Sequence, residues 1–222
     1  MAETRDVNTA AALAGLAIGL VVGPLADRLA TNSARHEPLL GRTPRSPRLA
    51  LVTVGTALLG GACGLAFGFT ADAVIGAAFC WVLVVITRTD LEHRLIPDRI
   101  VLPATLLVLA ARTADDPSIE WILAGVGASL FLFVFVLVYP KGIGMGDVKL
   151  AAFMGVSLGT SVVVALFLGF IAAFIPSAVL LVRHGRVAFK HAIPLGPFLA
   201  LGSVVALFAG DEILDWYSRA GH

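Results

Sequence analysis

Long apolar runs separated by short polar connections dominate the hydropathy pattern of this chain. A helix that crosses the hydrocarbon core of a bilayer needs about 20 mostly apolar residues. The pattern predicts eight such segments, over residues 7–27, 49–69, 72–87, 95–111, 119–139, 148–159, 161–182 and 193–209. The third, fourth and sixth segments are short for a full crossing, and they flank the most polar sequence motifs of the chain.

The composition indicates a membrane protein rather than a soluble one. Of the 222 residues, 58% are hydrophobic and 14% are charged, whereas a soluble domain has about 45–50% apolar and about 25% charged residues. We therefore predict an all-α fold, a polytopic integral membrane helix bundle of about eight transmembrane segments without a soluble domain. Residues 1–222 are expected to form a single membrane domain, with a first helix over 7–27, a cytoplasmic loop over 28–48 and a helical bundle over 49–209.

The basic residues predict how the chain is oriented. All 16 lysines and arginines except Arg5, Arg112 and Arg219 lie in the connections after the first, third, fifth and seventh segments. The positive-inside rule places these connections in the cytoplasm and both termini outside. A formal net charge of +1 provides no general field that would attract nucleic acid, so no nucleic-acid partner is expected.

Two of the cytoplasmic connections contain residues suited to catalysis. The first, over 88–99, contains Asp90, and the second, over 140–149, contains three alternating glycines followed by Asp147. Two carboxyl groups that lie close together cannot both ionise cheaply, so one keeps a proton while the other is charged. Such a pair can activate water and protonate a leaving amine, which is amide hydrolysis without a metal or a covalent intermediate.

The other polar residues at the membrane edges have simpler explanations. Asp27, Glu92 and Asp98 are predicted to be solvated loop residues or helix caps. The histidines lack the spacing of metal ligands, and both cysteines lie inside apolar runs, so no metal site is predicted. The glycines that recur every fourth residue in the first two segments are expected to serve helix packing.

The two polar connections resemble the motifs of a known family. Asp90 followed by Leu95-Ile96-Pro97-Asp98, together with the run KGIGMGDVKL over 141–150, is similar to the type IV prepilin peptidase family. Members of this family are aspartic proteases of the GxGD class in the prokaryotic cytoplasmic membrane. Residues 193–202 also resemble the family's last-helix motif, and the resemblance extends over 72–209.

The resemblance implies a reaction, a substrate and a set of site residues. It implies that Asp90 and Asp147 are the catalytic pair, that the substrate is a type IV pilin-like precursor, and that its N-terminal leader is cut at the cytoplasmic membrane face. Proteolysis would need no cofactor. A peptide bond inside a helix is poorly accessible, so we expect backbone groups of the enzyme to hold the substrate extended. The expected substrate-binding residues are Gly142, Gly144, Gly146, Lys149 and Pro97.

The chain also differs from that family, and other classes stay open. Many members carry two Cys-x-x-Cys pairs after the first helix, whereas residues 28–48 contain no cysteine. Residues 15–29 resemble the first-helix motif only loosely, so methylation of the product with S-adenosylmethionine is left open, as is the oligomeric state. One alternative is a proton-coupled secondary transporter, although such carriers tend to place ionisable groups at mid-membrane. Another is a GxGD intramembrane protease of the presenilin type, which has a tyrosine where this chain has Thr89.

Overall fold

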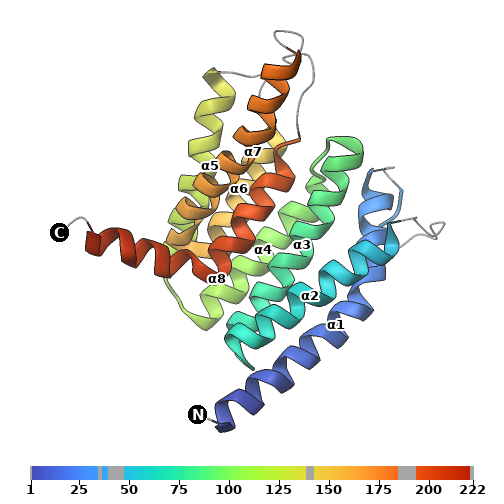
Figure 1. Cartoon of the computed structure of the whole chain (residues 1–222), viewed down its shortest axis with the longest axis vertical. Coiled ribbons are helices and arrows are strands. Elements are labelled where there is room, and N and C mark those ends of the chain that lie inside the picture. The colour runs from blue at the N-terminus through green and yellow to red at the C-terminus, as the bar shows by residue number, and fades with distance from the viewer. Residues whose placement is uncertain (1, 35–36, 40–47, 139–142, 185–193, 221–222) are drawn as a thin grey trace. The chain divides into compact units, whose positions relative to one another are not determined.

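The described part of the chain is helical throughout. The computed structural model describes residues 2–34, 37–39, 48–138, 143–184 and 194–220. These residues form α1 (Ala2–Ala34), α2 (Leu49–Phe67), α3 (Ala71–His93), α4 (Asp98–Asp115), α5 (Glu120–Val138), α6 (Met145–Leu158), the 3-10 turn η1 (Gly159–Ser161), α7 (Val162–His184) and α8 (Gly196–Ala220) (Figure 1). Each of the eight predicted segments corresponds to one α-helix, which confirms the all-α prediction.

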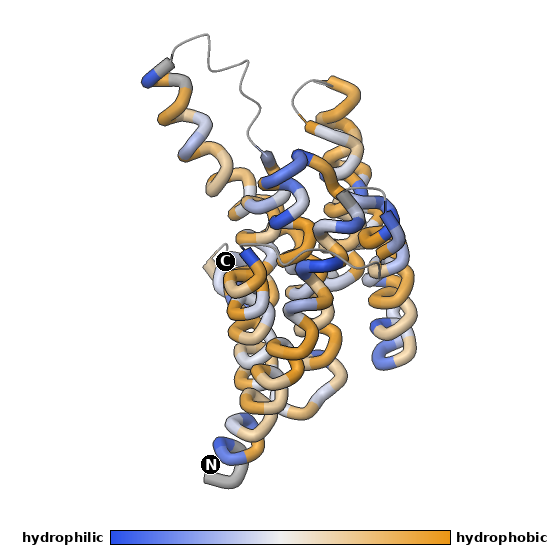
Figure 2. Tube along the Cα trace, turned by 90° about the vertical axis from the view of Figure 1, so that its right-hand side faces the viewer, coloured by the Kyte–Doolittle hydropathy of each residue, from blue (hydrophilic) through white to orange (hydrophobic). Residues whose placement is uncertain are grey.

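Most of these helices are long and apolar enough to cross a membrane. By length and composition, six helical stretches qualify among the described residues, with α6, η1 and the first part of α7 counted as one continuous stretch. The helix α4 does not qualify, because its 18 residues include Asp98, Arg99, Arg112 and Asp115. Figure 2 shows hydrophobic positions along most of the helical tubes, with the hydrophilic ones grouped in short stretches. The protein is therefore an integral membrane protein.

Several helices extend beyond the apolar segments that predicted them. The helix α1 continues to Ala34, α3 to His93 and α8 to Ala220. Hydropathy marks where a helix leaves the hydrocarbon, but backbone hydrogen bonding continues into the polar region beyond it. As a result, the connection predicted over 88–99 is reduced to 94–97, and α6 already begins at Met145 within the predicted loop 140–149.

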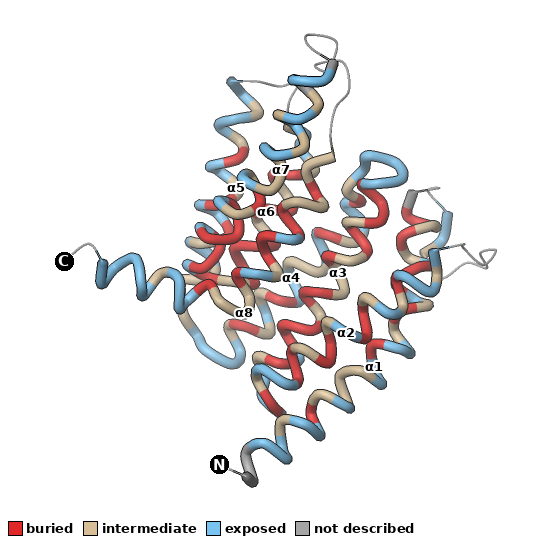
Figure 3. Tube along the Cα trace, in the orientation of Figure 1, coloured by how far each residue is buried: buried red, intermediate tan, exposed pale blue. Residues whose placement is uncertain are grey.

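The chain divides into two compact units, which we describe separately. The first unit, Met1–Pro117, contains α1 to α4, and the second, Ser118–His222, contains α5 to α8. In the first unit α3 packs against α1, α2 and α4, and it is buried along most of its length (Figure 3). The prediction of a single membrane domain stays a prediction.

Glycines bring α1 and α2 into backbone contact. A Cβ atom added at Gly15 would lie 2.2 Å from the carbonyl oxygen of Gly60, and one added at Gly64 would lie 2.3 Å from that of Ala11. Only residues without a side chain allow two helices to approach this closely. The prediction that these glycines serve helix packing is confirmed for Gly15, Gly19, Gly23, Gly60 and Gly64, whereas Gly68 follows the end of α2 with φ 68°.

In the second unit, α6 is the most buried helix. It packs against α5 and also contacts α7 and α8, and its side chains of Leu150, Phe153 and Met154 are fully buried. Gly155 allows α5 to approach, because a Cβ there would lie 2.4 Å from the carbonyl oxygen of Ala124. By contrast, the end of α8 beyond residue 210 is mostly exposed (Figure 3). This packing fixes the start of α6 within its unit.

Candidate active site

Asp90 lies in the last turn of α3 and is 6% exposed. The helix ends where Arg94 adopts a left-handed conformation, with φ 51° and ψ 42°, and donates its backbone N–H to the carbonyl oxygen of Asp90 at 2.9 Å. This is the one non-glycine residue with positive φ within the described residues. Asp90 therefore belongs to a helical turn rather than to a loop, so its position depends on how α3 is held.

The residues after this turn start the next helix. Pro97 is buried at the N-cap position of α4, and its carbonyl oxygen accepts the N–H groups of Ile100 (3.0 Å) and Val101 (3.1 Å). Proline fixes φ near the helical value and tolerates the start of a helix well. Asp98 is exposed in the first turn of α4, where a carboxylate interacts favourably with the helix dipole.

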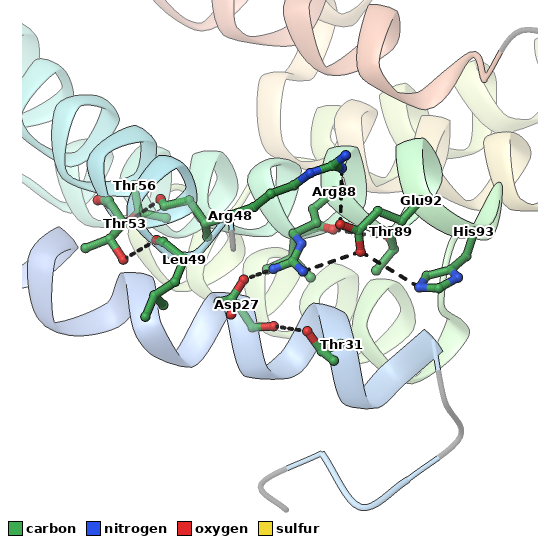
Figure 4. A network of polar contacts seen from close by, with 12 residues as sticks. Asp27, Thr31, Arg48, Leu49, Thr53, Thr56, Arg88, Thr89, Glu92 and His93 are labelled. Carbon is green, nitrogen blue, oxygen red and sulfur yellow. Dashed lines mark hydrogen bonds and ion pairs between the residues drawn. The ribbon is translucent and has the colours of Figure 1, made fainter. Parts of the chain in front are cut away.

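A buried ion pair lies beside this turn. The guanidinium of Arg88 on α3 contacts the carboxylate of Asp27 on α1, and both side chains are more than nine-tenths buried (Figure 4). Asp27 was predicted to be solvated or to cap a helix, and Arg88 to be a loop residue; both predictions are wrong. The reason is that α1 and α3 continue past their apolar segments and pack against each other there. A rule from membrane proteins would have indicated the pair, since ionisable residues within transmembrane helices usually pair with one another.

Glu92 connects the ion pair of Asp27 and Arg88 to the start of α2. Its carboxylate lies 3.4 Å from Nη2 of Arg88, one turn earlier on α3, and 3.1 Å from Nη1 of Arg48, the N-cap residue of α2. The ring of His93 lies 3.9 Å from the same carboxylate. The last turn of α3 is therefore tied to α1 through Asp27 and to α2 through Arg48, as Figure 4 shows.

Asp147 lies in the first turn of α6 and is 9% exposed. Gly144, the N-cap residue, donates its N–H to Oδ2 of Asp147 at 3.1 Å, and the N–H of Asp147 donates back to the carbonyl oxygen of Gly144 at 3.1 Å. The bond from the Asp147 side chain is the N3-to-N-cap half of a capping box, and it satisfies a backbone N–H at the helix start; glycine has no side chain to supply the other half. The side chain of Asp147 is therefore oriented by the backbone N–H of Gly144.

The other predicted binding residues fall around this helix start. Gly144 is exposed with φ −87° and ψ 157°, whereas Gly146 and the half-buried Lys149 are already helical. A Cβ at Gly144 would meet its nearest neighbour, Oδ2 of Asp147, at 3.6 Å, which is an ordinary contact. Neither the backbone conformation nor the packing requires glycine at this position. Gly142 lies outside the described residues.

The structure thus places the predicted site residues in two groups. Asp90 and Pro97 belong to the first unit, and Asp147, Gly144, Gly146 and Lys149 belong to the second. The pairing of the two aspartates stays a prediction. Within the part of the chain that the structure describes, no three His, Cys, Asp or Glu side chains are grouped so that they could hold a metal ion.

The fold and the site together define a class of protein, a polytopic membrane protein with buried carboxyl groups in the terminal turns of two helices. Residues 77–182, which contain both of these turns, match the family described as the type IV leader peptidase family. The chain belongs to the type IV leader peptidase family. No solved structure matches it.

Curated relatives agree with this assignment. A protein of Bacillus subtilis named prepilin leader peptidase/N-methyltransferase is 34% identical over 167 residues, which cover 74% of this chain and 67% of the relative. Proteins with the same name from Legionella pneumophila and Pseudomonas aeruginosa are 31% and 32% identical, with 79% and 77% of this chain covered. The chain spans 63% and 61% of the length of those two relatives.

Proposed function

We propose that this chain is a membrane-embedded aspartic endopeptidase that removes the N-terminal leader of a type IV pilin-like precursor at the cytoplasmic membrane face. The observation that carries the proposal is that Asp90 and Asp147 are both buried in terminal turns of membrane helices, within the part of the chain that matches a leader peptidase family. Buried carboxyl groups are unusual in soluble and membrane proteins alike, and they often mark functional sites.

The local surroundings of Asp147 support different roles for the two carboxyl groups. Asp147 accepts an N–H at the positive end of α6, and a hydrogen bond of this kind is stronger to a charged carboxylate than to a neutral acid. Asp90, in the last turn of α3, is the other member of the proposed pair. We therefore assign the base to Asp147 and the acid to Asp90.

With these roles, hydrolysis of the peptide bond needs no reagent other than water. Asp147 takes a proton from a water molecule, whose oxygen attacks the carbonyl carbon of the scissile bond while Asp90 gives its proton to the carbonyl oxygen. In the second step Asp147 passes its proton to the amide nitrogen, the C–N bond breaks, and one hydroxyl proton of the intermediate returns to Asp90. Both groups regain their starting states, as general acid–base catalysis requires.

The start of α6 offers backbone groups that can hold the substrate. Gly144 is exposed and extended. Its N–H already bonds Asp147, but its carbonyl oxygen has a second lone pair that can accept an N–H group of an extended peptide. With Gly142, Gly146 and Lys149 nearby in the sequence and Pro97 near Asp90, these residues form the binding set that we propose. An extended strand beside Gly144 would present its scissile carbonyl to the adjacent Asp147.

The direct test is incubation of the purified protein with precursor-derived peptides. We expect cleavage at a single bond after the leader, read by mass spectrometry, with no cleavage of a peptide of scrambled leader sequence. A protein that is folded but cleaves none of the pilin-like leaders would refute the proposed substrate class.

We also propose the bacterial cytoplasmic membrane as the location, with both termini outside and the site facing the cytoplasm. Leu95, in the connection before α4, and Asp115, at the end of α4, offer a matched test, because both are exposed. A membrane-impermeant thiol reagent added to intact cells should label Asp115→Cys and not Leu95→Cys. The native cysteines are buried, so they should stay unlabelled. Labelling at residue 95 from outside would reverse the orientation.

Leader cleavage should not depend on a metal ion. The proposed chemistry is complete with two carboxyl groups and water, so we expect the rate to be unchanged after incubation with excess EDTA. The measurement is the initial rate of cleavage before and after chelation. Loss of activity that zinc restores would show that the reaction belongs to another class.

Methyl transfer is a separate question, because the relatives are named N-methyltransferases. Within the loosely matching residues 15–29, Gly15, Gly19 and Gly23 lie directly against the backbone of α2, so these glycines serve helix packing. We therefore derive no methylation step for this chain. Cleavage in the presence of S-adenosylmethionine with a labelled methyl group decides whether the new N-terminus is modified.

A further inference from the structure

The turn that carries Asp90 is anchored on both sides of that residue. Arg88 precedes Asp90 by two positions and contacts Asp27 of α1, and Glu92 follows by two positions and contacts Arg48 of α2. Arg88 and Glu92 are also joined to each other at 3.4 Å along the helix. All four side chains belong to the first unit, and Figure 4 shows them as one continuous network.

We propose that this network, made of Asp27, Arg48, Arg88 and Glu92, positions Asp90 for catalysis. The inference rests on the proposed function, because positioning has meaning only if Asp90 reacts. None of the four is a catalytic residue here, since each acts through the backbone of the α3 turn and not on the substrate. With one ion pair before Asp90 and one after it, the network fixes both the rotation of the turn and its distance from α1 and α2.

Stability alone is a poor explanation for such a pair. Moving two charges out of water costs free energy, and the attraction between them often does no more than offset that cost. A pair of apolar side chains of similar size can stabilise a buried site equally well. An ion pair also constrains the relative orientation of the two side chains, because a guanidinium and a carboxylate attract each other strongly in only a few arrangements. Arg88 and Asp27 are 7% and 6% exposed, so solvent does not relax this constraint.

The position of the turn also needs support from outside the helix. It is the last turn before the break at Arg94, and terminal turns of helices fray when nothing holds them. The last carbonyl groups of a helix lack the intrahelical hydrogen bonds that hold a mid-helix turn. A displacement of about 1 Å in a reacting group can reduce a rate on the order of 100-fold.

The first test separates positioning from stability by removing both charges together. Asp27→Asn alone leaves a buried guanidinium without its carboxylate, so we expect a lower melting temperature in detergent and a lower kcat. The double variant Asp27→Leu/Arg88→Met should regain most of the melting temperature. We expect its kcat to remain at least about tenfold below the wild-type value, with KM within about twofold. If kcat recovers together with the melting temperature, the pair is only structural and the proposal fails.

A second variant decides the matter if the double variant does not fold. The side chain of Arg48 is 53% exposed, so Arg48→Gln should leave the melting temperature unchanged while it releases the turn from α2. We expect kcat to fall by roughly threefold to tenfold, with KM unchanged. The matched control is Arg219→Gln, which removes another exposed ion pair, with Asp215 at 3.4 Å, and should change neither value. An unchanged kcat in Arg48→Gln contradicts the proposal.

Hydrogen exchange provides a readout that does not depend on the reaction. In the wild type we expect the amides of residues 91–94 to be protected, and in Asp27→Leu/Arg88→Met and Arg48→Gln to exchange faster, while residues 75–86 stay unchanged. If the wild type cleaves no leader but this pattern is found, the proposed function fails and the anchoring of the turn stands. If the pattern is absent while the wild type cleaves leaders, the positioning role fails alone.

Discussion

Asparagine in place of either Asp90 or Asp147 should abolish leader cleavage. Each change keeps the size and the hydrogen-bonding capacity of the side chain but removes its ability to take or give a proton. We expect kcat to fall on the order of 10³-fold or more, because general acid–base groups contribute about 10²–10⁴-fold each. The measurement is single-turnover cleavage of a leader peptide by the purified variants in detergent.

The double variant and a neighbouring acid complete this experiment. Asp90→Asn/Asp147→Asn should be little slower than either single variant, because groups that act as a unit are not additive. Asp98→Asn is the matched control, since Asp98 is an exposed acid in the next helical turn along the chain, and it should keep most of the activity. The assignment is refuted if Asp98→Asn is inactive while Asp90→Asn still processes its substrate at a near-normal rate.

The same pair predicts the form of the pH dependence. Cleavage needs one charged and one protonated carboxyl group, so kcat/KM should be bell-shaped in pH. The two limbs should report apparent values that belong to the pair rather than to either aspartate. A profile with a single limb would indicate that only one of the two groups titrates during the reaction.

The second large effect should come from helix packing, where two glycines of α2 provide an internal comparison. A Cβ at Gly64 would lie 2.3 Å from the carbonyl oxygen of Ala11 on α1, whereas a Cβ at Gly55 would have no neighbour within 4 Å. Gly64→Ala should therefore force α1 and α2 apart and destabilise the protein by about 1–3 kcal/mol, as overpacking does. Gly55→Ala should stabilise it by up to about 1 kcal/mol, because alanine favours a helix over glycine.

Thermal unfolding in detergent measures both changes, and their signs should be opposite. Gly15→Ala serves as a third variant, because its added Cβ would meet the carbonyl oxygen of Gly60 in the same interface, so it should behave like Gly64→Ala. If Gly64→Ala and Gly55→Ala shift the melting temperature in the same direction, the close approach of α1 and α2 is not what stabilises this interface.

The sequence by itself determined the helices, the membrane class and the family. These properties depend on local composition: apolar runs specify spans, and a run of glycines ending in Asp147 after a membrane segment is specific enough to identify a family. Helix ends were less predictable. Arg88 and Asp90 lie outside the predicted apolar segment but inside α3, because the helix continues after it has left the hydrocarbon.

Only the tertiary structure showed what holds the turn of Asp90. Asp27 and Arg88 are 61 positions apart on different helices. In the sequence alone, neither differs from an ordinary charged residue at a membrane edge. The hydrogen bond from the N–H of Gly144 to the side chain of Asp147 is local, so it could be anticipated from their spacing. The pairing of Asp27 with Arg88 could not, because it depends on how α1 packs against α3.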